Sequence, residues 1–303
     1  MSGKARPLEL RGALTALVTP FTGDGAVDVP VLTRLVESQI AAGIDGLVPC
    51  GTTGEGATLA PDEHALVIRT VVEAARGRVP VIAGCGTNDT RTTLAAAERA
   101  VSAGADALLV VTPYYNKPNR SGMIAHYAAI AEAVDRPIVP YNVPSRTGQH
   151  LGAELILRLA EIPGVAGVKE ASGSIEQLAS VVEARRPGFA VLSGDDPLAL
   201  AAVALGAAGV VSVVSNEAPG PMAAMMRAAL TGDFEAARAI HYRLLPLMRA
   251  NFVETNPVPV KTAMAMMGVC GETLRPPLGP AEGSTRRLVA DALRHAGLLA
   301  TAS

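Results

Sequence analysis

Short apolar segments rich in β-branched residues recur along the chain, separated by longer segments of mixed polarity. They occupy residues 13–20, 45–50, 79–84, 105–111, 137–142, 164–169, 189–194 and 208–213. Apolar runs of this length, bounded by glycine, proline or polar residues, predict buried strands. Because a longer segment follows each of them, we expect parallel strands joined by helical crossovers.

The intervening segments show the periodicity of amphipathic helices. In one of them Leu32, Leu35 and Val36 fall on a single helical face. Asp28 and Asp89 stand where helix N-caps are expected. The clearest predicted helices are residues 31–42, 61–75, 89–103 and 121–134.

Eight strand–helix units fit either a closed (β/α)8 TIM barrel or an open doubly wound sheet. The count of eight and the even spacing favour the α/β barrel. After residue 213 the pattern predicts helices alone, at residues 221–230, 234–250, 258–267 and 282–296. We therefore expect a barrel domain at residues 1–230 and a C-terminal helical extension at residues 231–303.

The composition argues against some classes of function. The chain has 303 residues, of which 49% are hydrophobic, and a formal charge of −2, without a block of basic residues. This balance gives no support for nucleic-acid binding, and no apolar stretch is long enough to span a bilayer. Cys50, Cys85 and Cys270 have no metal-site spacing, so reduced thiols and a cytoplasmic location are expected.

The segment GVAGVKE ends a predicted strand with Lys169. The chain has only four lysines, Lys4, Lys117, Lys169 and Lys261, and all its other basic side chains except histidine are arginines. An arginine guanidinium cannot act as a nucleophilic amine near neutral pH, whereas a lysine in apolar surroundings can. A salt-bridged or snorkelling lysine is the alternative.

Reactive side chains cluster after several other strands, where the active sites of TIM barrels lie. The second strand is followed by GTTGEG, which is suited to binding a carboxylate or phosphate but lacks the lysine of a P-loop. The fourth and fifth strands lead into TPYYNKP and YNVPSRTG. Tyr114, Tyr115 and Tyr141 are therefore expected to converge on Lys169. Asp195 and Asp196, after the seventh strand, could hydrogen-bond in the mouth of the barrel, but their spacing also fits a helix N-cap, which is the preferred interpretation.

These motifs resemble those of the dihydrodipicolinate synthase family, within the pyruvate-dependent class I aldolase and N-acetylneuraminate lyase superfamily. The resemblance extends over residues 14–298. GTTGE, TPYYNKP, YNVPSRTG, GVKEASG, LSGDDPLAL and NPVPVK occur in the family's order. It implies a (β/α)8 barrel that condenses pyruvate with L-aspartate 4-semialdehyde, giving 4-hydroxy-tetrahydrodipicolinate for lysine and diaminopimelate biosynthesis. It also implies a homotetramer built as a dimer of dimers.

The resemblance also implies residue roles. Lys169 would form a Schiff base with pyruvate, and Tyr141 would exchange protons with it through Thr52 and Tyr115. In the family, the residue that matches Tyr115 comes from a neighbouring subunit. The carboxylate of pyruvate would be held by Gly51 and Thr53, and that of the semialdehyde by Arg146, whose planar fork suits carboxylates.

Three alternatives remain open. N-acetylneuraminate lyase and 2-keto-3-deoxy sugar acid aldolases use the same lysine and tyrosine, but they usually have GST in place of GTT and lack the matching arginine. A catalytically silent barrel with a binding or assembly role is the second alternative. A metal-dependent aldolase is disfavoured, and no cofactor is expected, because the five histidines are scattered: His64, His126, His150, His241 and His295.

Many family members are inhibited by lysine at a subunit interface. The positions that match that allosteric site are Gly56, Ala57, His64, Asn88 and Tyr114. Pro61 and Thr92, however, replace a histidine and a glutamate found in regulated relatives, so weak or absent lysine inhibition is expected. The NPVPVK segment, with Lys261, is predicted to be a helix entry outside the layer of strand ends.

Overall fold

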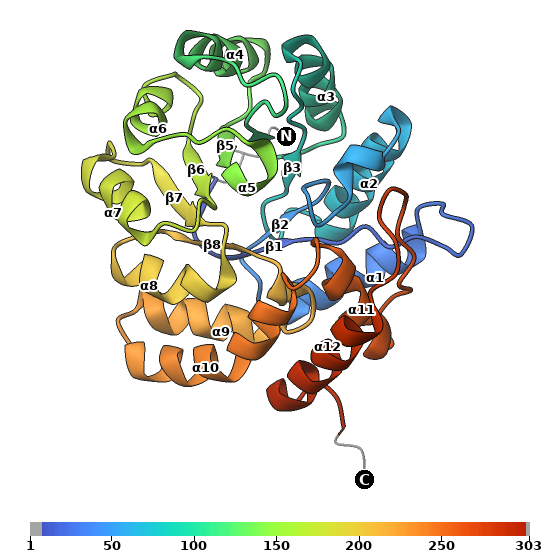
Figure 1. Ribbon diagram of the computed structural model, residues 1–303. Helices are drawn as coiled ribbons and strands as arrows, with labels where there is room; N and C mark the ends of the chain where they lie inside the picture. Colours follow the sequence, from blue (N-terminus) through green and yellow to red (C-terminus); the bar gives the residue numbers. More distant parts are fainter. Residues whose placement is uncertain (1–7, 301–303) are drawn as a thin grey trace.

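The computed structural model describes residues 8–300, and these contain eight parallel strands arranged as a barrel (Figure 1). The strands are β1 (Gly12–Ala16), β2 (Gly46–Val48), β3 (Ile82–Gly84), β4 (Ala107–Val111), β5 (Ile138–Asn142), β6 (Gly167–Glu170), β7 (Ala190–Ser193) and β8 (Gly209–Ser212). Their hydrogen-bonded order is β2-β1-β8-β7-β6-β5-β4-β3, and a parallel bridge between Leu47 and Val81 joins the two end strands. The predicted (β/α)8 barrel is confirmed.

Helices follow every strand and form the outer ring. They are α1 (Val29–Ala41), α2 (Pro61–Ala75), α3 (Thr90–Ser102), α4 (Arg120–Ala133), α5 (Pro144–Thr147), α6 (Ala153–Ala160), α7 (Ile175–Ala184), α8 (Ala199–Ala204) and α9 (Pro219–Leu230). Short 3-10 turns occur at η1 (Gly56–Thr58), η2 (Asp196–Leu198) and η3 (Val214–Asn216). The predicted caps are confirmed, since Asp28 accepts a hydrogen bond from the amide of Val31 and Asp89 from that of Thr92.

The strands are buried along almost their whole length, which explains their continuous apolar sequences. In a parallel barrel one side of each strand faces the interior and the other faces the helices, so neither side is solvated. β1 and β8 are tightly packed where they pair at their first residues. A Cβ atom at Gly209 would lie 2.0 Å from the carbonyl oxygen of Gly12, so a larger residue would separate these strands.

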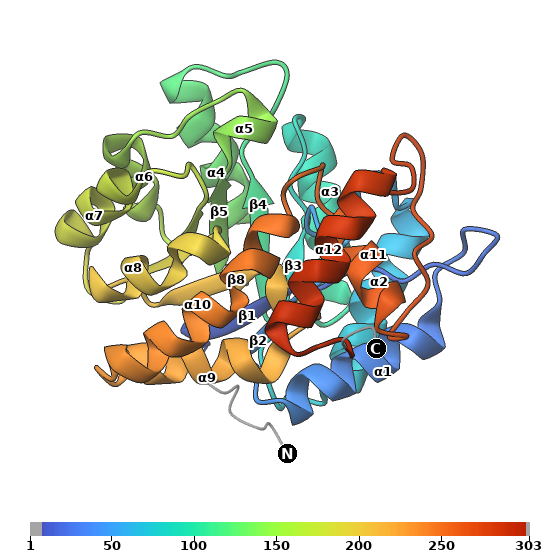
Figure 2. The ribbon, with the colours of Figure 1, turned by 60° about the horizontal axis from the view of Figure 1, so that its bottom comes forward.

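The chain after α9 forms α10 (Phe234–Ala250), α11 (Val258–Met266) and α12 (Gly283–Ala296). α10 packs against both α9 and α12, and α11 packs against α12 (Figure 2). The predicted C-terminal helices are therefore present. A boundary at residue 230 stays a prediction, because α9 and α10 are in extensive contact.

The connection after β5 contains a short helix that the sequence pattern did not predict. α5 begins at Pro144, whose fixed backbone angle suits the first turn of a helix. It ends at Gly148, which has a left-handed conformation with φ of +64°. This single turn carries Arg146 beside the ends of the strands.

Candidate active site

Lys169 is the third residue of β6 and lies at the C-terminal end of the barrel. It is only 6% exposed. It pairs in register with Tyr141 of β5, and its Nζ atom lies 4.1 Å from the centroid of the Tyr141 ring. The predicted association of Lys169 with Tyr141 is present in the structure.

Gly194 leaves space for the Lys169 side chain. It follows β7, and a Cβ atom at this position would lie 3.1 Å from Cε of Lys169 and 2.5 Å from Cβ of Ala171. Carbon atoms pack at about 3.5–4.0 Å, so even one methyl group here would displace the lysine or its neighbouring loop.

Glu170 faces away from the amine, as strand alternation predicts. One of its carboxylate oxygens accepts hydrogen bonds from Asn142 Nδ2 at 2.8 Å and Gln177 Nε2 at 3.0 Å. The other accepts one from the amide of Ser172 at 2.8 Å. The Glu170 carboxylate is therefore satisfied by β5 and by the start of α7, not by Lys169.

Two aspartates follow β7, and their predicted role as a helix cap is wrong. No side chain caps η2. Asp196 instead accepts hydrogen bonds from the amides of Val213 and Val214, both at 2.9 Å, and so connects the ends of β7 and β8. Burial raises the pKa of both Asp195 and Asp196, and the positive charge of Lys169 opposes this rise. Sequence spacing could not reveal this role, because the bonded amides lie on another strand connection.

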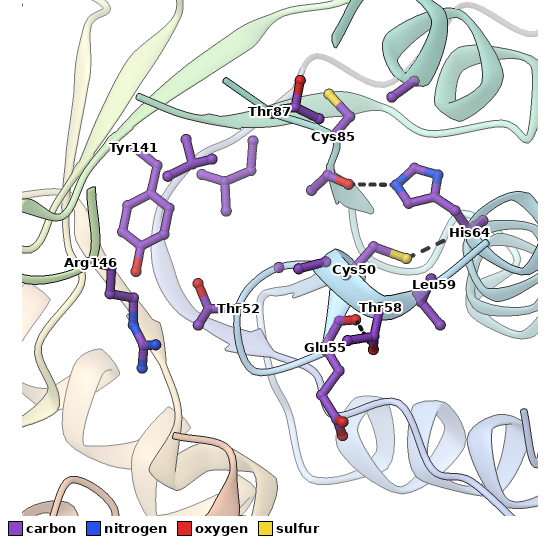
Figure 3. Close-up of a pocket in the computed structure, with 18 of the residues that line it drawn as sticks. Cys50, Thr52, Glu55, Thr58, Leu59, His64, Cys85, Thr87, Tyr141 and Arg146 are labelled. Carbon is purple, nitrogen blue, oxygen red and sulfur yellow. Dashed lines mark hydrogen bonds between the residues drawn. The ribbon is translucent and has the colours of Figure 1, made fainter. Parts of the chain in front are cut away.

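A cavity of about 530 Å³ opens at the ends of β2 to β5 (Figure 3). Of the predicted catalytic and substrate-binding residues, its lining includes Gly51, Thr52, Tyr141 and Arg146. In Figure 3 the hydroxyl groups of Thr52 and Tyr141 and the guanidinium of Arg146 lie close together on one side. Lys169 is not among the residues that line this cavity, but its Nζ atom contacts the ring of Tyr141, which does line it.

Thr53 is not among the residues that line the cavity, and its side chain contacts a segment of the C-terminal extension. It is 3% exposed, and its Oγ1 accepts a hydrogen bond from Asn256 Nδ2 at 2.9 Å. The carbonyl oxygen of Asn256 accepts a hydrogen bond from Arg146 Nη2 at 3.2 Å. One residue thus holds both the turn after β2 and the arginine after β5. Sequence reasoning missed Asn256, although it is the first residue of the NPVPVK motif.

The predicted place of NPVPVK outside the layer of strand ends is therefore wrong. Asn256 and Pro257 line the cavity. Lys261, farther along the motif, is fully buried and pairs with Glu55 of the turn after β2. The pattern correctly predicted a helix entry, since α11 begins at Val258, but it could not show which loop that helix contacts.

Four of the five predicted allosteric residues share the cavity with Thr52 and Tyr141. Gly56, Ala57, His64 and Tyr114 line its other part, whereas Asn88 does not. His64 Nε2 hydrogen-bonds the carbonyl oxygen of Gly84 at 2.7 Å, and burial lowers the pKa of this histidine. Pro61 and Thr92 also line this part.

Tyr115 does not join the other tyrosines within a single chain. It is 89% exposed, lies in the loop between β4 and α4, and has a left-handed backbone with φ of +69°. Tyr114 lines the cavity and is 36% exposed. The expected convergence of all three tyrosines is therefore wrong for an isolated chain, because the left-handed residue interrupts the alternation that would continue from β4.

The described part of the chain gives little support for reactive thiols or a metal site. Cys50, Cys85 and Cys270 are buried and unpaired, and burial raises the pKa of the Cys85 thiol to about 12. Among residues 8–300 no cluster of three or more histidine, cysteine, aspartate or glutamate side chains is arranged to hold a metal ion. No helix in the same range is long and apolar enough to cross a membrane.

The chain is similar in sequence and in structure to proteins named dihydrodipicolinate synthase or 4-hydroxy-tetrahydrodipicolinate synthase. A 4-hydroxy-tetrahydrodipicolinate synthase from Syntrophus aciditrophicus is 48% identical over 289 residues, covering 95% of this chain and 99% of that protein. The crystal structure of dihydrodipicolinate synthase from Thermotoga maritima matches with a TM-score of 0.94 at 42% identity, covering 96% of this chain and all of that one. The chloride-inhibited dihydrodipicolinate synthase from Acinetobacter baumannii, complexed with pyruvate, matches with a TM-score of 0.94 at 41% identity, with the same coverage.

The profile of the Dihydrodipicolinate synthetase family matches residues 9–296, which is nearly the whole chain. This match includes all eight strands, the buried lysine and the C-terminal helices. The chain belongs to the Dihydrodipicolinate synthetase family.

Proposed function

We propose that the chain is a 4-hydroxy-tetrahydrodipicolinate synthase, which condenses pyruvate with L-aspartate 4-semialdehyde through a Schiff base on Lys169. The observation that carries this proposal is the buried amine of Lys169, in contact with the Tyr141 ring at the C-terminal end of the barrel. A buried lysine amine packed against a tyrosine suits imine formation, because the amine can attack the ketone and the tyrosine is close enough to serve proton transfer.

The chemistry starts with attack of the Lys169 nitrogen on the keto carbon of pyruvate. Water leaves, and the resulting imine withdraws electrons so that the methyl group can lose a proton. The enamine carbon then attacks the aldehyde carbon of the semialdehyde and forms the new carbon–carbon bond. The amino group of the semialdehyde displaces Lys169 from the imine carbon, which closes the ring and frees the enzyme.

Tyr141 exchanges the protons of these steps, because its ring lies against Nζ of Lys169. Thr52, which lines the same cavity, relays them to Tyr115 of a neighbouring subunit. A chain of hydroxyl groups suits this task better than a lone tyrosine, since a phenol with an ordinary pKa near 10 is a weak base at neutral pH.

The two carboxylates are bound by different strand connections, that after β2 and that after β5. The turn that begins at Gly51 presents amides and the Thr53 region to pyruvate. Arg146 binds the carboxylate of the semialdehyde, and its bond to the Asn256 carbonyl fixes its direction. The sequence Thr52–Thr53 together with Arg146 favours this substrate over the polyhydroxy aldehydes that sugar acid aldolases use.

Borohydride reduction in the presence of pyruvate tests the proposal. The wild-type protein should gain one pyruvyl adduct on Lys169, located by peptide mass spectrometry. Lys117→Ala, at an exposed position, should be labelled like the wild type. No adduct in the wild type would support a catalytically silent barrel, and a preference for polyhydroxy aldehydes in rate assays would support the sugar acid aldolases. EDTA should leave the rate unchanged, because none of these steps uses a metal.

The enzyme acts as a homotetramer, a dimer of dimers, in the cytoplasm. The exposed position of Tyr115 supports a site that is shared between two subunits. The three unpaired thiols support a reducing compartment. Analytical ultracentrifugation is the direct test of the assembly, and a dimer would still contain complete sites.

Lysine inhibits this enzyme weakly or not at all. Thr92 Oγ1 donates a hydrogen bond to Asp89, and the carboxylate of Glu55, which also lines the cavity, is already paired with Lys261. Loss of a charged partner typically lowers affinity by about ten- to a hundredfold. Half-inhibition at micromolar lysine in a steady-state assay would contradict this expectation.

A further inference from the structure

The turn that leads from β2 to α2 is held in an unusual conformation. Cys50 and Glu55, at its two ends, are non-glycine residues with left-handed φ values of +57° and +52°. Conformations of this kind persist where the surroundings enforce them. Between these two residues lie Gly51 and Thr53, the proposed pyruvate-binding groups, together with Thr52 of the proposed proton relay. Whatever enforces the turn therefore also sets the positions of these groups.

The main chain supplies part of this constraint. The amide of Glu55 bonds to the carbonyl of Thr52 at 3.1 Å, and the hydroxyl of Thr19 bonds to the carbonyl of Gly54 at 2.7 Å. A Cβ atom at Gly56 would lie 2.1 Å from the carbonyl oxygen of Cys50, so the turn is closed too tightly for any side chain there.

The side chain of Glu55 supplies the other part, through the C-terminal extension. One carboxylate oxygen lies 2.5 Å from Nζ of Lys261, and the other accepts the amide of Arg275 at 3.0 Å. Lys261 also donates to the carbonyl of Thr273 at 2.8 Å and lies 4.2 Å from the centroid of the Phe21 ring. Glu55 therefore has a partner at each oxygen, and both partners come from beyond residue 260.

This ion pair differs from the others in the described part of the chain. The Lys261 and Glu55 side chains are 0% and 1% exposed, whereas the Arg275–Glu63 pair is 16% and 30% exposed. In all remaining pairs both side chains are more than 35% exposed. Burying two charges is a weak way to gain stability, because well-packed apolar residues often replace such a pair without loss. What the pair supplies is specific positioning, because it holds the Glu55 carboxylate and the Lys261 amine in one relative arrangement.

We propose that Lys261 is a positioning residue for pyruvate binding: its buried contact with Glu55 fixes the turn that carries Thr52 and Thr53. This inference rests on the proposed function. The extension holds the turn at two points, since Asn256 bonds to the Thr53 hydroxyl and Lys261 bonds to Glu55. The start of α11 therefore forms part of the substrate site, although none of its residues performs the chemistry.

The test measures pyruvate binding separately from stability. Lys261→Met removes the charge and keeps the chain length similar. The pyruvate concentration that gives half-maximal borohydride trapping on Lys169, and the KM for pyruvate, should each rise about tenfold or more, since a misplacement of about 1 Å can cost on the order of a hundredfold. The KM for the semialdehyde should change much less, because Arg146 is held by Asn256 instead.

A second variant covers the possibility that an unpaired buried Glu55 prevents folding. Glu55→Gln with Lys261→Met removes both charges and should restore the melting temperature without restoring pyruvate affinity. Arg286→Gln is the matched control, because it removes a half-exposed ion pair with Glu272 in the same C-terminal segment. It should leave both pyruvate measurements unchanged.

The outcomes are distinct. If either Lys261 variant folds and binds pyruvate with wild-type affinity, the ion pair is only structural and the inference is wrong. If the wild-type protein itself forms no adduct, the proposed function fails first. An equal rise in both KM values with unchanged half-saturation of trapping would also count against a role in pyruvate binding.

Discussion

Lys169 and Tyr141 are 6% and 7% exposed at the ends of two paired strands, whereas Tyr115, in the loop after the neighbouring strand, is 89% exposed. The first two are positioned by strand register and by close packing around Gly194. Tyr115 is positioned by a left-handed turn that faces solvent in an isolated chain. Lys169 and Tyr141 are thus positioned by the barrel itself. The surroundings of Tyr115 depend instead on what packs against the loop between β4 and α4, called here the β4 loop.

This difference separates two steps of the proposed reaction. Imine formation needs the amine and the adjacent phenol, which one chain supplies. Proton relay to Tyr115 needs a second chain that brings this residue to Thr52. Variants in the two regions should therefore fail at different stages, and the following predictions use that separation.

The largest effect is expected from Lys169→Ala. Because no other group in the site can form the imine, the rate of product formation should fall by at least about a thousandfold, and borohydride trapping should be lost. Lys117→Ala is the control. Undiminished product formation in Lys169→Ala would remove the basis of the proposed mechanism.

A smaller but still large effect is expected from Tyr115→Phe. Loss of one relay hydroxyl should lower kcat by about a hundredfold, while pyruvate is still trapped on Lys169. Mixing Lys169→Ala and Tyr115→Phe subunits, after reversible dissociation, should regain activity, because hybrid dimers contain one site in which both residues are intact. If the mixture stays inactive, Tyr115 does not act across the interface.

Gly194→Ala should lower kcat by about tenfold. The added methyl group displaces Lys169 Cε or Ala171, and modest misplacement of a reacting group slows its reaction. Gly23→Ala is the matched control, since a Cβ atom there meets no other atom within 4 Å. A wild-type rate for Gly194→Ala would mean that the packing around the amine is looser than described.

The smallest effect concerns the contact between α4, which follows the β4 loop, and α3. His126 on α4 is 4% exposed, its Nδ1 lies 2.9 Å from Thr90 Oγ1, and burial lowers its pKa to about 4. Between pH 6.5 and 4 the unfolded chain binds a proton here that the folded chain does not. The free energy of unfolding should therefore fall as the pH falls, by about 1.4 kcal/mol for each unit of pKa difference.

Urea denaturation across this pH range measures the effect. His126→Gln should reduce the slope, whereas the same change at the exposed His295 should retain it. An unaltered slope in His126→Gln would assign the pH dependence to other groups.

The alternation of apolar and amphipathic segments was enough to predict the barrel. α2 and α10 have the predicted boundaries, and the strands differ from prediction mainly at their ends. This success has a physical basis, because strands buried on both sides and helices buried on one leave a local signature. Lys169 could also be identified from the sequence, because a charged residue in an apolar strand is unusual.

Contacts between distant segments could not be predicted. Asn256 reaches Thr53 across more than two hundred residues, and Asp196 bonds to amides that follow β8. Each of these side chains also fits a common local role, a helix entry or a cap, and the local interpretation was chosen. The exposure of Tyr115 depends on the backbone angle of one residue, which its sequence motif does not specify.

The seam between β2 and β3 has a consequence for substrate binding. One bridge pair and a hydrogen bond from the amide of Gly84 to the carbonyl of Pro49 close the barrel there. The cavity lies at this seam and is lined by Cys50 and Gly51 from one side and by Gly84 and Cys85 from the other. A ligand in this cavity would clamp the two edges together. Occupied protein should then resist heat better than empty protein, because binding to the folded state alone stabilises it.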